Sequence, residues 1–143
     1  MEALQPYLYL MTPFAAWLVA GVSKFVINSI RAKQWAFGLI GYGGMPSNHS
    51  AIVSSMVMLI ALQEGINHPA FGVAVVVAFI VMLDANSLRR QVGKHAVEIN
   101  KLNQSDNRLR ERMGHTKFEI LGGVFTGFTV AYLLVLMTSI QAL

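Results

Sequence analysis

Four short groups of polar residues in this sequence have side chains that could act together on a phosphate ester. Phosphoryl transfer needs cations that hold the non-bridging oxygens and stabilise the charge of the transition state. Lysine and arginine supply such cations, and an arginine can bind phosphate through two parallel hydrogen bonds. The groups are Lys24 with Arg31, the stretch Gly43 to Ser50, Asp84 with Arg89 and Arg90, and the stretch Gly114 to Glu119.

The Gly43 to Ser50 stretch has the form of an anion-binding turn. It reads Gly-Gly-Met-Pro-Ser-Asn-His-Ser and precedes an apolar segment. A Gly-rich turn that enters a helix offers free backbone N–H groups to an anion. The Ser47 hydroxyl and the Asn48 amide add further donors. The candidate phosphate ligands are therefore Lys24, Arg31, Ser47, Asn48, Arg89 and Arg90.

Two histidines and a glutamate could supply the covalent chemistry without a metal or cofactor. His115 and Glu119 are four residues apart, so a helix would place them on one face. A histidine can form a covalent phospho-intermediate when a carboxylate orients and activates its ring. His49 would then protonate the leaving oxygen as general acid. A divalent ion held by Asp84, His115 and Glu119 is the alternative that this pattern leaves open.

Several of these residues also have a purely structural explanation. A histidine at a membrane interface is more often a polar boundary residue than a catalyst. His68 fits that description, and His95 lies in the basic loop without a clear partner, so both are left out of the site. Asp84 either supports the site or simply pairs with Arg89 or Arg90, because a carboxylate at the end of a span is costly unless it has a role or a partner.

The elements that position these groups are apolar segments. The sequence is 55% hydrophobic and 13% charged, whereas a soluble domain carries roughly 25% charged residues. A helix crosses the hydrocarbon core with about 20 mostly apolar residues. We therefore predict an all-α integral membrane protein, one domain over residues 1–143, with about four transmembrane helices in a compact bundle. The expected spans are Tyr7 to about Ile30, about Ser50 to Leu62, Pro69 to about Leu83 and about Phe118 to Leu143.

The segments between these spans predict the topology. The apolar patch Trp35 to Tyr42 is too short to span, so residues 35–44 are expected to be re-entrant or interfacial. All eleven Lys and Arg residues fall on one side, because both tails and the 64–68 loop have none, and the segment after Leu83 is a long basic loop. The positive-inside rule predicts that this side is cytoplasmic, with both termini outside, in a multi-pass protein of the cell membrane.

The charges and the missing cysteines exclude some classes of function. The net charge of +4 is explained by topology and by anionic head groups, notably for Lys33, Lys101 and Lys117, so no nucleic-acid partner is expected. The absence of cysteine excludes disulfides and thiolate metal sites. The expected partners are the bilayer and a lipid or polyprenyl phosphate. Four helices enclose a site only thinly, which leaves room for a homo-oligomer.

The motifs resemble those of the phosphatidic acid phosphatase type 2 superfamily, which also includes vanadium haloperoxidases. Lys24 and Arg31 keep the spacing of its first motif, although Ala32 replaces the proline that follows. The second motif, Pro-Ser-Gly-His, reads Pro-Ser-Asn-His here and ends at His49. His115 and Glu119 keep the spacing of the third, His-x-x-x-Asp.

One arginine of the third motif is displaced. The superfamily has it six residues before the histidine, whereas position 109 here is Leu, with Arg108 and Arg110 beside it. The combination of Gly-Gly-Met-Pro-Ser-x-His-Ser-Ala, Asp-Ala with Arg-Arg, and Gly-His-Thr resembles a small divergent branch. In that branch Arg89 or Arg90 is expected to hold the phosphate instead.

The resemblance implies a metal-independent membrane phosphatase acting on lipid phosphates and diphosphates, including phosphatidate and polyprenyl diphosphates. It implies that His115 is the nucleophile, Glu119 its orienting carboxylate and His49 the general acid, with a phosphohistidine intermediate. One alternative is a lipid-phosphate-binding membrane protein without turnover. Another is a small transporter or channel subunit, although the charged residues within the predicted spans, Lys24 and Glu119, lie near the basic side and not along a path through the membrane.

Overall fold

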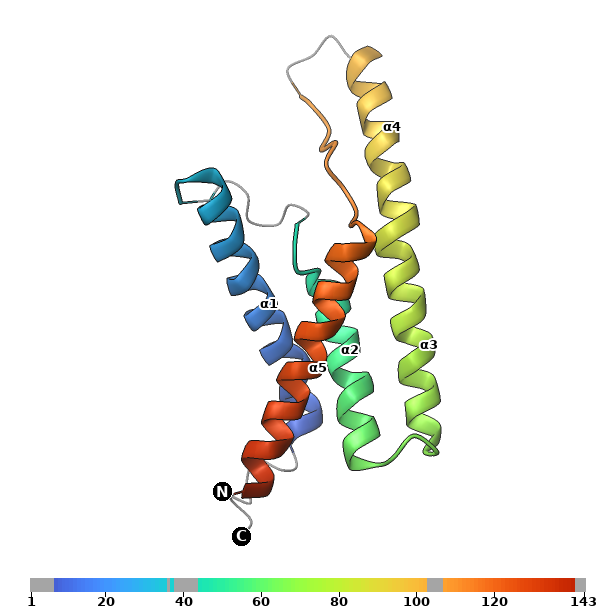
Figure 1. Cartoon of the computed structure of the whole chain (residues 1–143). Helices are drawn as coiled ribbons and strands as arrows, with labels where there is room; N and C mark the ends of the chain where they lie inside the picture. Colours follow the sequence, from blue (N-terminus) through green and yellow to red (C-terminus); the bar gives the residue numbers. More distant parts are fainter. Residues whose placement is uncertain (1–6, 36, 38–43, 103–106, 141–143) are drawn as a thin grey trace.

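The computed structural model is a bundle of helices (Figure 1). It describes residues 7–35, 37, 44–102 and 107–140, and the described part of the chain contains no strand. The prediction of an all-α membrane bundle is therefore confirmed. The predicted re-entrant segment lies largely outside the described residues. The elements are α1 (Leu8–Ala32), α2 (Asn48–Gln63), α3 (Pro69–Leu83), the π-helix η3 (Asp84–Leu88), α4 (Arg89–Leu102) and α5 (Lys117–Ile140).

Three of the described helical stretches are long and apolar enough to cross a membrane, and they agree with the predicted spans. They are Leu8–Ala32, Pro69–Leu102 and Lys117–Ser139. The remaining predicted span, about Ser50 to Leu62, corresponds to α2. This helix has 16 residues and is about 24 Å long at 1.5 Å per residue. Because α2 contacts α1, α3 and α5, it is largely enclosed by protein and can be shorter than a helix that faces lipid.

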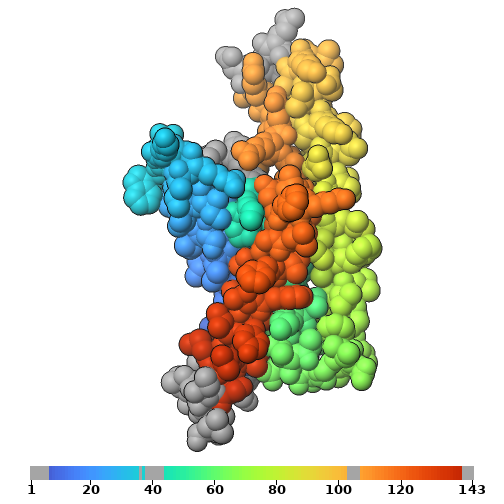
Figure 2. Space-filling view, viewed as in Figure 1, coloured from blue at the N-terminus to red at the C-terminus, as the bar shows by residue number. Residues whose placement is uncertain are grey.

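The segment after Leu83 differs from the prediction. We expected a long loop there, but α3 continues through η3 into α4, giving one helical stretch of 34 residues. Such a stretch is about 50 Å long and exceeds the roughly 30 Å hydrocarbon core. Figure 2 shows α4 and residues 107–112 projecting beyond the other helices. The prediction was wrong because hydropathy marks where lipid contact ends and does not mark where a helix ends.

Small residues let α5 pack directly on α2. A Cβ atom added at Gly123 would overlap the Ser47 carbonyl oxygen, and one at Gly127 would overlap the Ala51 carbonyl oxygen. On the facing side of α2, Ser55 is fully buried. Close backbone approach through Gly, Ala and Ser is how membrane helices associate, because lipid provides no hydrophobic drive between them. This contact fixes the start of α5 beside the start of α2.

The cations gather at one end of the bundle, as predicted. The eleven Lys and Arg residues belong to the C-terminal part of α1 with its cap, to α4 and to residues 107–117. In Figure 1 these parts lie at the end opposite the α2–α3 connection. At that opposite end, the Tyr9 hydroxyl donates to Glu64 Oε1 over 2.6 Å. The bundle therefore has one basic face, and the candidate site residues lie toward it.

Candidate active site

His115 lies buried just before α5, with its ring against the Glu119 carboxylate. The side chain is 8% exposed, and His115 Nδ1 is 3.3 Å from Glu119 Oε2. The same carboxylate oxygen accepts the backbone N–H of Thr116 over 2.9 Å, and the Glu119 N–H donates to Thr116 Oγ1 over 3.3 Å. This reciprocal pair is a capping box. Glu119 therefore both caps α5 and fixes the orientation of the His115 ring.

The backbone at His115 is anchored on the π-helix. The His115 N–H donates to the Ala85 carbonyl oxygen over 2.8 Å. The preceding Gly114 has φ +81°, and a Cβ there would lie 2.6 Å from Arg90 Cγ and 3.1 Å from the Ala85 oxygen. Only glycine accommodates both this backbone conformation and this approach. π-Helical turns are often found at functional sites, and here one receives the histidine predicted as nucleophile.

The Pro-Ser-Asn-His motif begins α2 and is joined to the start of α5. Ser47 is fully buried, and its Oγ accepts the Ser50 N–H over 3.4 Å and the Ser50 hydroxyl over 3.0 Å. The Ser47 N–H donates to the Glu119 carbonyl oxygen over 2.9 Å. Ser47 is therefore the N-cap of α2, and its predicted role as a phosphate ligand stays a prediction.

Three buried polar atoms near the basic end have no hydrogen-bond partner among the described residues of the protein. They are Asn48 Oδ1, His49 Nδ1 and Asn86 Oδ1. The Asn48 amide nitrogen is 3.5 Å from where a Gly21 Cβ would be, so it packs against α1. Buried polar groups without partners are costly and mark places where a ligand can bind. Asn86, on the π-helix, is a candidate that the sequence did not single out.

The charge of Lys24 acts on both histidines, and the Asp84–Arg89 pair acts on His49. The charge of Lys24 lies within electrostatic range of both rings, His115 and His49. Arg89 Nε is 2.7 Å from Asp84 Oδ2, so Asp84 pairs with Arg89, and its supporting role in the site stays a prediction. Both members of this pair also act on the His49 ring. Side chains from α1, α2, η3, α4 and α5 therefore contribute to the surroundings of the two histidines.

Two predicted phosphate ligands, Arg31 and Arg90, are not bonded to the other candidate residues that the structure describes. Arg31 and Arg90 are exposed, and neither makes a hydrogen bond to another candidate residue within the described ranges. The charge of Arg110 acts on Lys24, as does the charge of Glu119. The sequence offered a signal for Arg110, since it stands one position from the arginine that the resemblance led us to expect.

The ligand set considered for a divalent ion is not assembled. Among the residues that the structure describes, no three His, Asp or Glu side chains are placed to hold a metal ion. The Asp84 carboxylate is turned to Arg89, and the Glu119 carboxylate is turned to the cap of α5.

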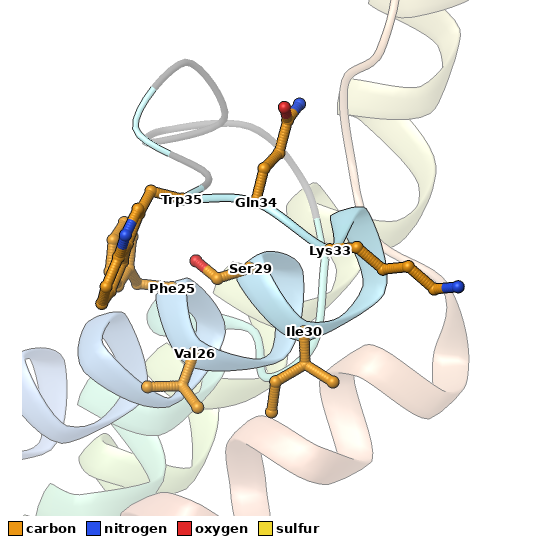
Figure 3. Close-up of a pocket in the computed structure, with 7 residues that line it drawn as sticks. All are labelled: Phe25, Val26, Ser29, Ile30, Lys33, Gln34 and Trp35. Carbon is orange, nitrogen blue, oxygen red and sulfur yellow. The ribbon is translucent and has the colours of Figure 1, made fainter.

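A separate hollow of about 570 Å³ opens at the basic end of α1 (Figure 3). The Phe25 and Trp35 rings stack along it with centroids 6.0 Å apart. Its lining is mostly apolar, and it includes none of the candidate catalytic residues. Aromatic side chains at this depth are typical of the membrane–water interface, where they anchor a helix end. The residues that line it are Phe25, Val26, Ser29, Ile30, Lys33, Gln34 and Trp35.

The comparisons with known proteins agree with these motifs. The model of the divergent PAP2 family matches residues 7–130, which include the candidate catalytic residues His49 and His115 and the Asp84–Arg89 pair. The uncharacterized membrane protein YuiD of Bacillus subtilis (strain 168) is 31% identical over 145 residues, covering 87% of this chain and 92% of that protein. No solved structure matches the chain. With the family match extending over most of its length, the chain belongs to the divergent PAP2 family.

Proposed function

We propose that the protein is a metal-independent phosphatase that hydrolyses a phosphomonoester or diphosphate of a lipid or polyprenyl substrate. The observation that carries the proposal is the buried His115 ring, held by the capped Glu119 carboxylate within electrostatic range of Lys24 and His49. With Nδ1–H donated to Glu119, the lone pair of Nε2 is free to attack. Because Glu119 is fixed by the helix cap, this tautomer is pre-organised.

The reaction would proceed in two steps. Nε2 of His115 attacks phosphorus, the bond to the lipid oxygen breaks, and protonated His49 gives its proton to that oxygen. Water then attacks the phosphohistidine, with His49 now accepting a proton, and inorganic phosphate leaves. Lys24, Arg89 and Arg110 would offset the charge on the non-bridging oxygens. Arg31, Ser47, Asn48 and Arg90 stay predicted phosphate ligands.

The position of the site suits an amphiphilic substrate. The candidate residues lie at the basic end of helices that are long enough to span a membrane. A lipid phosphate could therefore keep its chain in the bilayer while its head group reaches the cations. A water-soluble phosphate ester would gain nothing from this placement.

We also propose that the basic face is cytoplasmic and that both termini are outside. The eleven cations at one end support this orientation through the positive-inside rule. The chain has no cysteine, so single cysteines can be introduced without background. In intact cells, a membrane-impermeant thiol reagent should label Asn67→Cys in the α2–α3 connection but not Gln91→Cys on α4. Labelling of position 91 alone would reverse the orientation.

Binding of a lipid phosphate without turnover is the second candidate function. One observation favours it: the Arg89 guanidinium already pairs with Asp84, so one predicted phosphate ligand is partly engaged. If binding without turnover is its function, the protein should bind orthovanadate, a phosphate analogue, and should release no phosphate from any substrate.

Phosphate release by the purified protein distinguishes the two functions. The substrates are phosphatidate, a polyprenyl monophosphate and a polyprenyl diphosphate in detergent micelles, with excess chelator throughout. We expect release from at least one of them that chelation does not reduce. Vanadate binding without release from any substrate would replace the phosphatase by the binding protein.

The acidic limb of the pH–rate profile should report the ionisation of His115. Burial lowers the pKa of His115 below its usual 6.5, and the Lys24 charge adds to this, whereas Glu119 opposes it through its hydrogen bond and charge. Since the neutral ring is the nucleophile, the acidic limb of kcat/KM, which reports His115, should lie below pH 6.5. Glu119→Gln removes the opposing carboxylate, so the limb should move to still lower pH while the rate drops about 10²- to 10⁴-fold.

The substrate ionises in the same way with the wild-type protein and with Glu119→Gln. A difference between their two pH–rate profiles therefore reports the protein and not the substrate. A limb that stays in place, or moves to higher pH, in Glu119→Gln would show that Glu119 does not act on the nucleophile.

A further inference from the structure

An extended segment, residues 107–113, lies along α4 on the part of the molecule that projects beyond the other helices (Figure 1). The side chain of Asn100 on α4 holds this segment. Asn100 Nδ2 donates to the Leu109 carbonyl oxygen over 2.8 Å, and Asn100 Oδ1 accepts the Leu109 N–H over 2.8 Å. Nδ2 also donates to Glu111 Oε1 over 2.9 Å. Asn100 therefore bonds to both neighbours of Arg110.

A second contact holds the segment nearer the bundle. Gly93 of α4 is buried, and a Cβ there would meet the Glu111 carbonyl oxygen and would lie 3.4 Å from the Met113 nitrogen. The Glu111 oxygen in turn accepts the Met113 N–H over 3.0 Å. The extended segment is thus fixed on α4 at two levels, and Arg110 stands between them.

Arg110 is the residue of this segment that acts on the candidate site. Its charge acts on the Lys24 ammonium of α1, and its Nε donates to the Arg112 carbonyl oxygen over 3.4 Å. Two cations held within electrostatic range repel each other, and an anion between them would offset this cost. Leu109 and Glu111 are held on α4, so the clamp fixes the backbone from which the Arg110 side chain extends.

We infer that Asn100 is a positioning residue of the phosphate site: by holding Leu109 and Glu111 it fixes the segment that carries Arg110, and Arg110 and Lys24 bind the anion together. This inference rests on the proposed function only in that the site binds a phosphate group. It does not require turnover. In this arrangement α4 and residues 107–113 position Arg110 for phosphate binding.

Binding of orthovanadate by the full-length protein in detergent tests the inference. Asn100→Ala removes the clamp. Asn100→Asp keeps the acceptor for the Leu109 N–H but loses both donated bonds and adds a carboxylate beside Glu111. We expect each variant to bind vanadate about tenfold more weakly, the loss of one charge-assisted contact. The matched control is Lys101→Ala, the next residue, which removes an exposed cation paired with Glu98 and should leave binding within about twofold.

The double variant separates positioning from general stability. In an Arg110→Ala background, Asn100→Ala should cause no further loss, because the residue through which it acts is gone. Unchanged vanadate binding in both Asn100 variants would overturn the inference, as would an equal loss with and without Arg110. A wild-type protein that binds vanadate but hydrolyses nothing would contradict the proposed phosphatase and leave the role of Asn100 standing.

Discussion

Replacing His115 by asparagine should lower phosphate release by the purified protein by on the order of 10³-fold or more, the usual loss when a covalent nucleophile is removed. Asparagine keeps a polar side chain that can face Glu119, so the cap of α5 stays intact. It has no nitrogen lone pair with which to attack phosphorus. The measurement is inorganic phosphate released from the best lipid substrate per mole of monodisperse protein.

Two other histidines provide matched controls for that variant. His68 caps α3 through its Nδ1, which accepts the Ala70 N–H over 3.2 Å, and asparagine is itself a good N-cap. His95 is exposed on α4. Both His→Asn variants should keep wild-type rates. If His115→Asn retained more than about a tenth of the wild-type rate, the assignment of the nucleophile would be wrong.

His49 should show a different pattern, because its proposed task is proton transfer to the leaving group. His49→Ala should lose most activity toward a lipid alkyl phosphate, whose leaving oxygen needs a proton. It should lose much less toward an activated aryl phosphate, whose leaving group departs without one. Equal losses on both substrates would contradict a general-acid role.

Gly127→Ala should destabilise the protein by about 1–3 kcal/mol, the usual cost of overpacking. In an unconstrained helix the same change stabilises by about 0.5–1 kcal/mol. At Gly127, however, the new Cβ would overlap the Ala51 carbonyl oxygen and lie 2.9 Å from the Ser55 nitrogen. Thermal unfolding in detergent, followed by size-exclusion recovery after heating, should therefore show a lower midpoint.

Gly72→Ala is the control for that change. It lies in α3 and has nothing within 4 Å of the added Cβ, so its midpoint should stay the same or rise. Equal midpoints for the two variants would show that α5 does not pack on α2 as closely as described. The packing matters for the site, because it places the Ser47 N–H on the Glu119 carbonyl oxygen and so joins the two histidine motifs.

The sequence predicted the spans and the basic face because lipid imposes simple rules on composition. Runs of apolar residues had to be helices, and the Lys and Arg residues could be counted by segment. The same rules could not show α4, since a helix outside the bilayer needs no apolar run. Gly93 and Asn100 of this helix contact the extended segment that follows it, and hydropathy does not report such contacts.

The candidate site was predictable where its geometry is local. The spacing of His115 and Glu119 places them together on one turn, and Thr116 with Glu119 also has the spacing of a capping box. Arg110 and Asn86 were not identified, because their relation to Lys24 and to the buried interior depends on how separate helices pack. The N-cap role of Ser47 was likewise visible only once Ser50 was placed.

Trapping the phosphorylated protein tests whether His115 is the nucleophile. The wild-type protein is mixed with a substrate carrying labelled phosphate, quenched in alkali, where phosphohistidine survives, and digested for peptide mapping. We expect label on the peptide that contains His115, and none on that peptide in His115→Asn. Label on another residue, or steady release of phosphate by a protein that never carries label at His115, would contradict that role.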